Sequence, residues 1–204
     1  MGELRAPLGA DAVHLCVDMQ RLFAAEGPWP TPWLARVLPL VVRLVEHARE
    51  RAIFTRFIPP ARIEEARGQW RAYYEKWPQV TRQHLDPDLI ELVQPLARFA
   101  PPAPVFDKFV YSAFANPSLH AFLRERRLTT LIVTGSETDV CVLASVLAAV
   151  DLGYRVIVAR DAICSSSDET HDALIKLYTD RFDRQIELAE TEEIIDAWPL
   201  VIAA

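Results

Sequence analysis

Cysteine is scarce in this chain of 204 residues, which contains only Cys16, Cys141 and Cys164. An odd number of cysteines without framework spacing excludes a disulfide-stapled scaffold and is typical of a protein in a reducing cytoplasm. Long apolar runs are also missing, because the longest, 140–150, is interrupted by Ser145 and is well short of the ~20 residues that cross a bilayer. We therefore expect a soluble, cytoplasmic protein without a membrane partner.

Positive charge is in the minority. The chain carries 22 Lys and Arg residues against 28 Asp and Glu residues, which gives a net charge of −6 at pH 7. A negative surface repels the phosphate backbone, so we expect no nucleic-acid partner. The one dense basic run, 124–127, is better explained as the positively charged end of a helix that begins near Pro117.

Short apolar segments alternate with longer helical patterns along the chain. We expect strands at 13–17, 52–55, 104–106, 130–134, 155–159 and 185–188, and helices at 33–51, 87–96, 117–127, 140–152, 168–180 and 191–198. This alternation predicts a single α/β domain over residues 1–204, in which helices cover both faces of a mainly parallel sheet. The connection 57–86 is unusually long, and connections of this length generally form a lid or carry structure of their own.

One cysteine lies where a strand is expected to turn into a helix. In the segment 134–142, TGSETDVCV, Gly135 permits a sharp turn and Cys141 falls in the first turn of the following helix. Unpaired backbone N–H groups and the positive end of the helix dipole favour a thiolate there, and the same N–H groups could hold an oxyanion. A small buried core residue explains this segment equally well when it is taken alone.

Two charged residues follow other predicted strands. Asp18 comes directly after the strand 13–17, and Lys108 follows the strand 104–106. In an open α/β sheet the ligand crevice lies at this edge, beyond the carboxyl ends of the strands. Taken singly, Asp18 could cap a helix and Lys108 could be a solvated surface charge.

Together the three segments resemble the isochorismatase-like cysteine hydrolases, a family that includes nicotinamidases, N-carbamoylsarcosine amidase and other small-amide hydrolases. The resemblance covers nearly the whole chain. Asp18, Lys108 and Cys141 match the family's catalytic set in order, and residues 135–142 match its turn Gly-x-x-Thr-x-x-Cys-Val. The resemblance implies a three-layer α/β/α sandwich with a six-stranded sheet, and an assembly of two or four identical subunits.

The resemblance also implies roles for individual residues. The backbone N–H groups of Glu137 and Cys141 would hold the oxyanion, and the peptide bond between Ser136 and Glu137 would be cis. Asp18 would take the thiol proton, while Lys108 would keep Asp18 charged and lower the pKa of the thiol. The expected substrate-binding residues are the aromatic matches Phe23 and Trp70, together with Tyr111 and Phe114 beyond the third strand.

Two positions depart from the family pattern. Nicotinamidases begin a metal site with Asp-x-His after the second strand, whereas this chain has Phe57 and Pro59 there, and neither side chain can bind a metal. The histidines show no ligand spacing, so we expect no metal and no other cofactor. Glu137 occupies a position that is more often small and apolar in the family. Three roles stay open for it: a subunit interface, a pair with an arginine, or contact with a donor on the substrate.

The sequence favours a metal-independent hydrolase that cleaves the C–N bond of a small amide, carbamoyl or ureido compound through a thioester. Arg56 follows the second strand, and we expect it to face the pocket, where it would bind a substrate carboxylate or pair with Glu137. Two alternatives stay open. One is a vinyl-ether hydrolase in which Asp18 supplies a proton without the thiol, and the other is a non-catalytic member that binds a metabolite or a partner.

Overall fold

The computed structural model describes residues 4–199, so the two ends of the predicted domain, 1–3 and 200–204, lie outside the described residues. The centre is a sheet of six strands: β1 (Ala12–Val17), β2 (Ala52–Phe57), β3 (Val105–Lys108), β4 (Thr130–Ser136), β5 (Arg155–Cys164) and β6 (Ile186–Ala189). The strand order is β3-β2-β1-β4-β5-β6, and every pair of neighbours is parallel. The predicted α/β sandwich around a parallel sheet is therefore confirmed.

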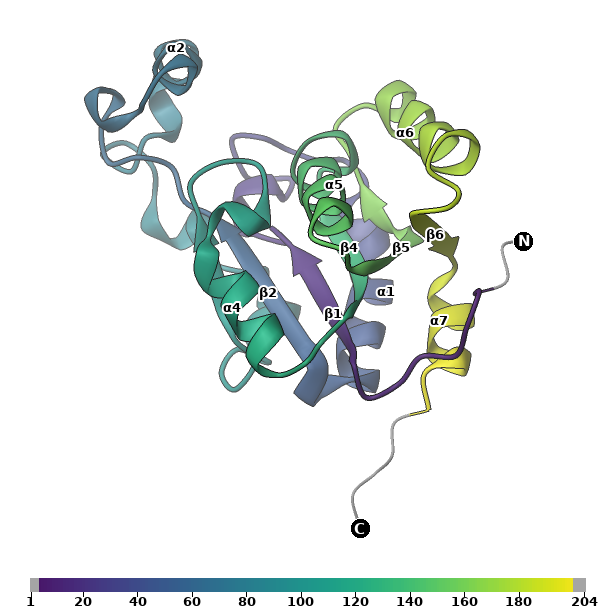
Figure 1. The fold of residues 1–204 in the computed structure, drawn as a ribbon. Coiled ribbons are helices and arrows are strands. Elements are labelled where there is room, and N and C mark those ends of the chain that lie inside the picture. The colour runs from purple at the N-terminus through teal and green to yellow at the C-terminus, as the bar shows by residue number, and fades with distance from the viewer. Residues whose placement is uncertain (1–3, 200–204) are drawn as a thin grey trace.

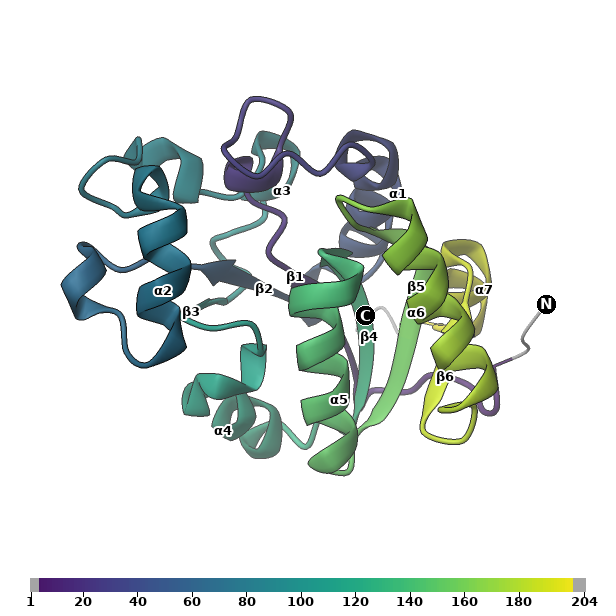
Figure 2. The ribbon, with the colours of Figure 1, turned by 90° about the horizontal axis from the view of Figure 1, so that it is seen from above.

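Helices cover both faces of the sheet (Figures 1 and 2). One face carries α1 (Leu34–His47) and α7 (Thr191–Ala197), and the other carries α4 (Pro117–Glu125), α5 (Leu143–Asp151) and α6 (Asp168–Asp180). Side chains alternate across each strand, so Cys16 and Phe54 enter the core on the α1 side, whereas Leu15 and Ile53 enter the core on the α5 side. Strands that are apolar on both faces are what a fully covered parallel sheet requires.

The predicted helix at 87–96 is wrong. The chain instead forms a 3₁₀ turn at Pro87–Ile90 and a one-turn helix, α3 (Gln94–Ala97). Proline has no N–H and its ring clashes with the preceding turn, so Pro95 is tolerated in the first turn of a helix but not within a longer one.

Across residues 4–199, none of the helices has the length and apolarity required to cross a membrane.

The connection 57–86 carries structure of its own. It contains the helix α2 (Gln69–Lys76) between 3₁₀ turns at Ile63–Glu65 and Pro78–Val80, and α2 stands away from the sandwich (Figure 1). Aromatic rings hold this segment to the strand ends, because the Trp70 ring lies 6.2 Å from Phe57 and 4.7 Å from Tyr111, measured between centroids. The connection therefore forms an aromatic-rich cover beside the carboxyl ends of β2 and β3.

Strands β1 and β4 lie side by side at the centre of the sheet, where the strand order reverses. Gly135 in β4 has a φ of 115°, and a Cβ atom on it would lie 2.0 Å from the carbonyl oxygen of Val17 in β1. Only glycine permits this conformation and this close approach. Asp18, directly after β1, is thereby brought beside the turn that carries Cys141, at the place where ligands bind in open α/β sheets.

Candidate active site

The structure brings Asp18, Lys108 and Cys141 together from three separate strand ends. The Lys108 ammonium lies 2.6 Å from Oδ2 of Asp18 and donates a hydrogen bond of 3.3 Å to the sulfur of Cys141. The side chains of Asp18 and Lys108 are 0% and 1% exposed, so both charges are buried. A buried pair of charges persists only when each is well partnered.

Asp18 is held in place by the neighbouring strand. It has a φ of 49°, which aspartate tolerates better than most residues, and its N–H donates to the hydroxyl of Thr55 in β2 at 3.2 Å. The same hydroxyl donates to Oδ1 of Asp18 at 2.6 Å. Because Thr55 fixes one carboxylate oxygen and Lys108 the other, the carboxylate has a defined orientation toward the thiol.

Lys108 lies between the carboxylate of Asp18 and the sulfur of Cys141. Besides its two side-chain contacts, its ammonium donates to the carbonyl oxygen of Val110 at 3.0 Å and lies 5.1 Å from the centre of the Phe57 ring. Burial lowers the pKa of Lys108, but its interactions with Asp18 and Cys141 outweigh burial, and the net pKa is raised. The side chain therefore stays a cation at neutral pH.

Cys141 sits in a π-helical turn, Thr138–Val142, that precedes α5. π-turns of this kind occur often at functional sites. Burial and the Asp18 charge raise the pKa of the Cys141 thiol, and Lys108 offsets only part of that rise. The pKa is thus shifted in the direction opposite to the one expected for a helix start beside Lys108, because a nearly dry site beside a carboxylate favours the neutral thiol.

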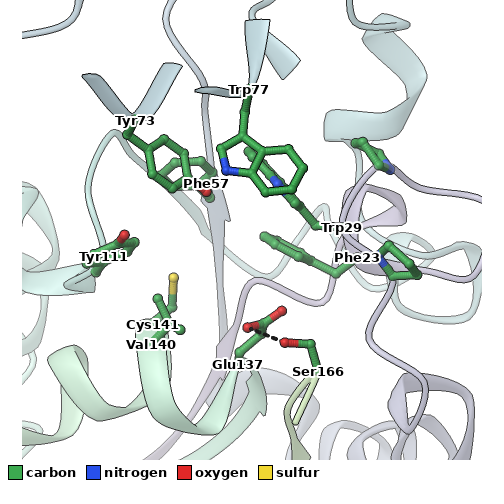
Figure 3. A pocket seen from close by; sticks show the side chains of 12 residues that line it. Phe23, Trp29, Phe57, Tyr73, Trp77, Tyr111, Glu137, Val140, Cys141 and Ser166 are labelled. Carbon is green, nitrogen blue, oxygen red and sulfur yellow. Dashed lines mark hydrogen bonds between the residues drawn. The ribbon is translucent and has the colours of Figure 1, made fainter. Parts of the chain in front are cut away.

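A cavity of about 440 Å³ opens directly above the sulfur (Figure 3). Its walls are mostly aromatic and proline side chains, and its lining residues are Phe23, Pro28, Trp29, Pro30, Phe57, Tyr73, Trp77, Tyr111, Glu137, Val140, Cys141 and Ser166. Asp18 and Lys108 do not line it, so a bound molecule would meet the trio through the sulfur of Cys141. Small apolar cavities with a few polar groups are the usual form of a binding site for a small molecule.

The expected substrate-binding aromatics fall into two groups. Phe23 and Tyr111 line the cavity. Trp70 stands behind the wall instead, with its ring against those of Phe57, Tyr73 and Tyr111. Phe114 does not line the cavity either, because its ring packs on Tyr154 at a centroid distance of 5.7 Å. The expectation of substrate contact is thus corrected for Trp70 and Phe114.

Arg56 faces away from the cavity. Its guanidinium binds both carboxylate oxygens of Asp107, at 2.8 and 3.1 Å, and contacts Glu91 at 2.7 Å. Successive residues of a strand point to opposite faces, so Phe57 on the cavity wall directs Arg56 to the other face, where Asp107 is its register partner. The expected roles as a substrate clamp and as a partner of Glu137 are both corrected by this ion pair.

Other residues of the site had little or no signal in the sequence. Tyr73 and Trp77 line the cavity from the connection 57–86, for which the sequence predicted only a lid or a segment with structure of its own. Trp29, between Pro28 and Pro30, was missed, although a Trp flanked by prolines after Asp18 was a usable signal. Its ring stacks on Phe23 at 6.1 Å.

Glu137 contributes a carboxylate to the cavity. The peptide bond between Ser136 and Glu137 is cis. Carboxylate oxygens of Glu137 accept hydrogen bonds of 3.3 Å from the hydroxyls of Thr31 and Ser166, and Figure 3 shows the second of these. Burial and the charge of Asp139 raise the pKa of Glu137, and the two hydrogen bonds lower it by less.

A family model described as the isochorismatase domain matches residues 12–190. The chain belongs to the isochorismatase family. An uncharacterized isochorismatase family protein of Bacillus subtilis, YaaI, is 28% identical over 193 residues, which cover 92% of this chain and 98% of that protein. A protein of Arabidopsis thaliana named as a probable inactive nicotinamidase is 30% identical over 176 residues, which cover 79% of this chain and 84% of that protein.

Solved structures of other proteins also resemble this chain. A cysteine hydrolase from Pseudomonas syringae pv. phaseolicola superposes with a TM-score of 0.84 at 25% identity over 97% of both chains. The pyrazinamidase of Pyrococcus horikoshii, solved in complex with zinc, shares the fold with a TM-score of 0.68 at 20% identity, covering 88% of this chain and 99% of that one. By its family and by its fold, this chain is therefore an isochorismatase-like hydrolase.

Proposed function

We propose that this isochorismatase-family protein is a cysteine hydrolase that cleaves the C–N bond of a small amide, carbamoyl or ureido compound through a thioester intermediate. One observation carries the proposal. The Lys108 ammonium bridges Asp18 at 2.6 Å and the Cys141 sulfur at 3.3 Å, and that sulfur is on the wall of the cavity. A nucleophile, a base and a charge that orients both are the parts that covalent hydrolysis needs.

The proposed reaction begins with attack of the sulfur on the carbonyl carbon, while the thiol proton passes to the carboxylate of Asp18. The C–N bond then breaks, and the departing nitrogen takes that proton and leaves as ammonia or an amine. Water attacks the thioester and gives a proton to Asp18, which returns it to the sulfur as the C–S bond breaks. The backbone N–H groups of Glu137 and Cys141 would stabilise the oxyanion in both steps.

The chemistry of the side chains favours a reaction without a metal. Phe57 stands where the resemblance to nicotinamidases places the first metal ligand, and its ring is part of the cavity wall. Pro59 offers no ligand atom either. Within the described range 4–199, no three His, Cys, Asp or Glu side chains are grouped to hold a metal ion. These residues do not fit the family's metal, and the proposed reaction uses none.

Ammonia release from a panel of small amides, carbamoyl compounds and ureides tests the proposal. We expect turnover of at least one compound by the native protein and a loss of roughly 10³-fold or more in Cys141→Ala. Cys16→Ala is the matched control, because Cys16 is buried in the core on the α1 side of the sheet. The Cys16→Ala protein should keep the native rate of ammonia release. Equal rates in Cys141→Ala and the native protein, or no turnover of any compound, would contradict the proposal.

A further inference from the structure

The cavity above Cys141 holds a single ionisable carboxylate. Of the residues that line it, Glu137 alone is an Asp, Glu, Lys, Arg or His. Asp18 and Lys108 do not line the cavity and form an ion pair with each other, with 2.6 Å between the charged groups. The charge that a bound molecule would meet directly is therefore the negative charge of Glu137.

That carboxylate has no positive partner among the described residues 4–199. Its two hydrogen-bond donors are the neutral hydroxyls of Thr31 and Ser166, and no ion pair within residues 4–199 includes it. Burial and Asp139 raise the pKa of Glu137, as expected for a carboxylate that lacks a counter-charge. A cation in the cavity would supply the missing charge.

Aromatic rings form the wall opposite Glu137 (Figure 3). The Trp29 ring lies 6.1 Å from Phe23, 6.2 Å from Phe57 and 6.1 Å from Tyr73, so these rings make one continuous surface. Trp77 and Tyr111 extend the lining. The faces of such rings attract ammonium groups, and desolvation strengthens that attraction.

We propose that Glu137 and this aromatic wall select substrates in which an alkylammonium group is attached close to the scissile amide or carbamoyl group. The inference rests on the proposed hydrolase function and names its substrate class. Glu137 supplies the ionic contact and the rings surround the alkyl groups of the cation. Carboxylate-bearing substrates are disfavoured, because Glu137 would repel them and no arginine or lysine among residues 4–199 lines the cavity.

Two amides of nearly the same shape isolate the effect of charge. Trimethylammonioacetamide carries a quaternary nitrogen where 3,3-dimethylbutanamide carries a carbon. Their binding is measured by calorimetry on the Cys141→Ala protein, which has no nucleophile. We expect the cationic amide to bind at least tenfold more tightly than its neutral analogue at low salt. Equal binding of the two amides, or failure of the cationic amide to bind at millimolar concentration, would overturn the inference.

Glu137→Gln in the same background identifies the residue responsible. The side chain keeps its size and the backbone N–H is unchanged, so affinity for the neutral amide should stay within about twofold while the cationic preference falls below threefold. Glu46→Gln is the matched control, because Glu46 is a surface residue of α1 that pairs with Arg98, and it should leave the preference intact. A cationic preference that survives Glu137→Gln would overturn the assignment of Glu137.

Turnover separates this inference from the function on which it rests. If the native protein hydrolyses neutral and cationic amides with equal kcat/KM, the hydrolase proposal stands and the cation preference is refuted. If it releases ammonia from neither amide nor any other compound of the panel, while the Cys141→Ala protein binds the cationic amide tenfold more tightly, the cation site stands and the hydrolase proposal is refuted.

Discussion

Removal of the Lys108 charge should destabilise the protein strongly, because the charge is buried against Asp18. At an effective dielectric constant of about 20, two unit charges 2.6 Å apart attract by roughly 6 kcal/mol before the cost of desolvation. Lys108→Met keeps a side chain as long as the aliphatic part of lysine and leaves the carboxylate of Asp18 without its counter-charge. We expect the free energy of unfolding at pH 7 to fall by about 3–5 kcal/mol.

The double variant Asp18→Asn/Lys108→Met distinguishes charge pairing from packing. Each single change leaves one buried charge unpaired, whereas the double change removes both charges. The double variant should therefore be more stable than the sum of the single effects predicts, with a coupling free energy of about 3 kcal/mol or more. Urea unfolding at pH 7, followed by tryptophan fluorescence, supplies the four free energies of the cycle.

The pair Arg98–Glu46 is the matched control. Its charged atoms lie 2.7 Å apart, nearly as close as in the buried pair, but the side chains are 53% and 44% exposed. The same cycle there should give a coupling of only about 0.2–1 kcal/mol, since water screens the charges. A coupling below about 1 kcal/mol for Asp18 and Lys108 would refute the argument that burial makes this pair strong.

Four further predictions concern other parts of the molecule. Gly135→Ala should lower the free energy of unfolding by about 3 kcal/mol or more in urea titrations, because the new Cβ would meet a backbone oxygen at 2.0 Å; unchanged stability would contradict this. Burial lowers the pKa of His14 to about 3, so between about pH 6.5 and 3 the unfolded chain binds a proton that the folded chain does not, and stability falls as the pH is lowered. His14→Gln should make this fall shallower by up to about 1.4 kcal/mol per pH unit in unfolding curves, and equal slopes would refute it. Arg56→Ala should cost about 1 kcal/mol of stability and leave KM within about twofold, whereas a large rise in KM for acidic substrates alone would restore the substrate clamp. Exhaustive treatment with EDTA should leave the rate of ammonia release unchanged, and a loss that zinc or iron restores would show that a metal takes part.

The strands and the reactive trio could be predicted from the sequence because each depends on local pattern. A short β-branched segment followed by glycine and then an apolar helix specifies the strand-turn-helix unit around Cys141 almost without regard to the rest of the chain. Asp18 and Lys108 follow similar segments, and parallel strands bring their carboxyl ends to one edge of the sheet. Their positions at strand ends placed them at this edge, and the resemblance to the isochorismatase-like hydrolases implied that they meet Cys141 there.

The walls of the cavity depended on contacts that no local pattern encodes. Trp29 and Tyr73 are far apart in the chain, and their rings meet because the loop before α1 and the helix α2 cover the same strand ends. The direction of Arg56 depended on Asp107 in the neighbouring strand, which offers a bidentate partner on the face opposite the cavity.

The protonation state of Cys141 was decided in the same way. Local sequence supplied a helix start, which favours a thiolate by less than about 1 kcal/mol. Tertiary packing supplied burial and the nearby carboxylate of Asp18, which together raise the pKa of the thiol. Sequence alone therefore identified the residues that are proposed to carry the chemistry, whereas burial and charge pairing, which arise only when distant segments pack together, set the direction of their pKa shifts and what surrounds them.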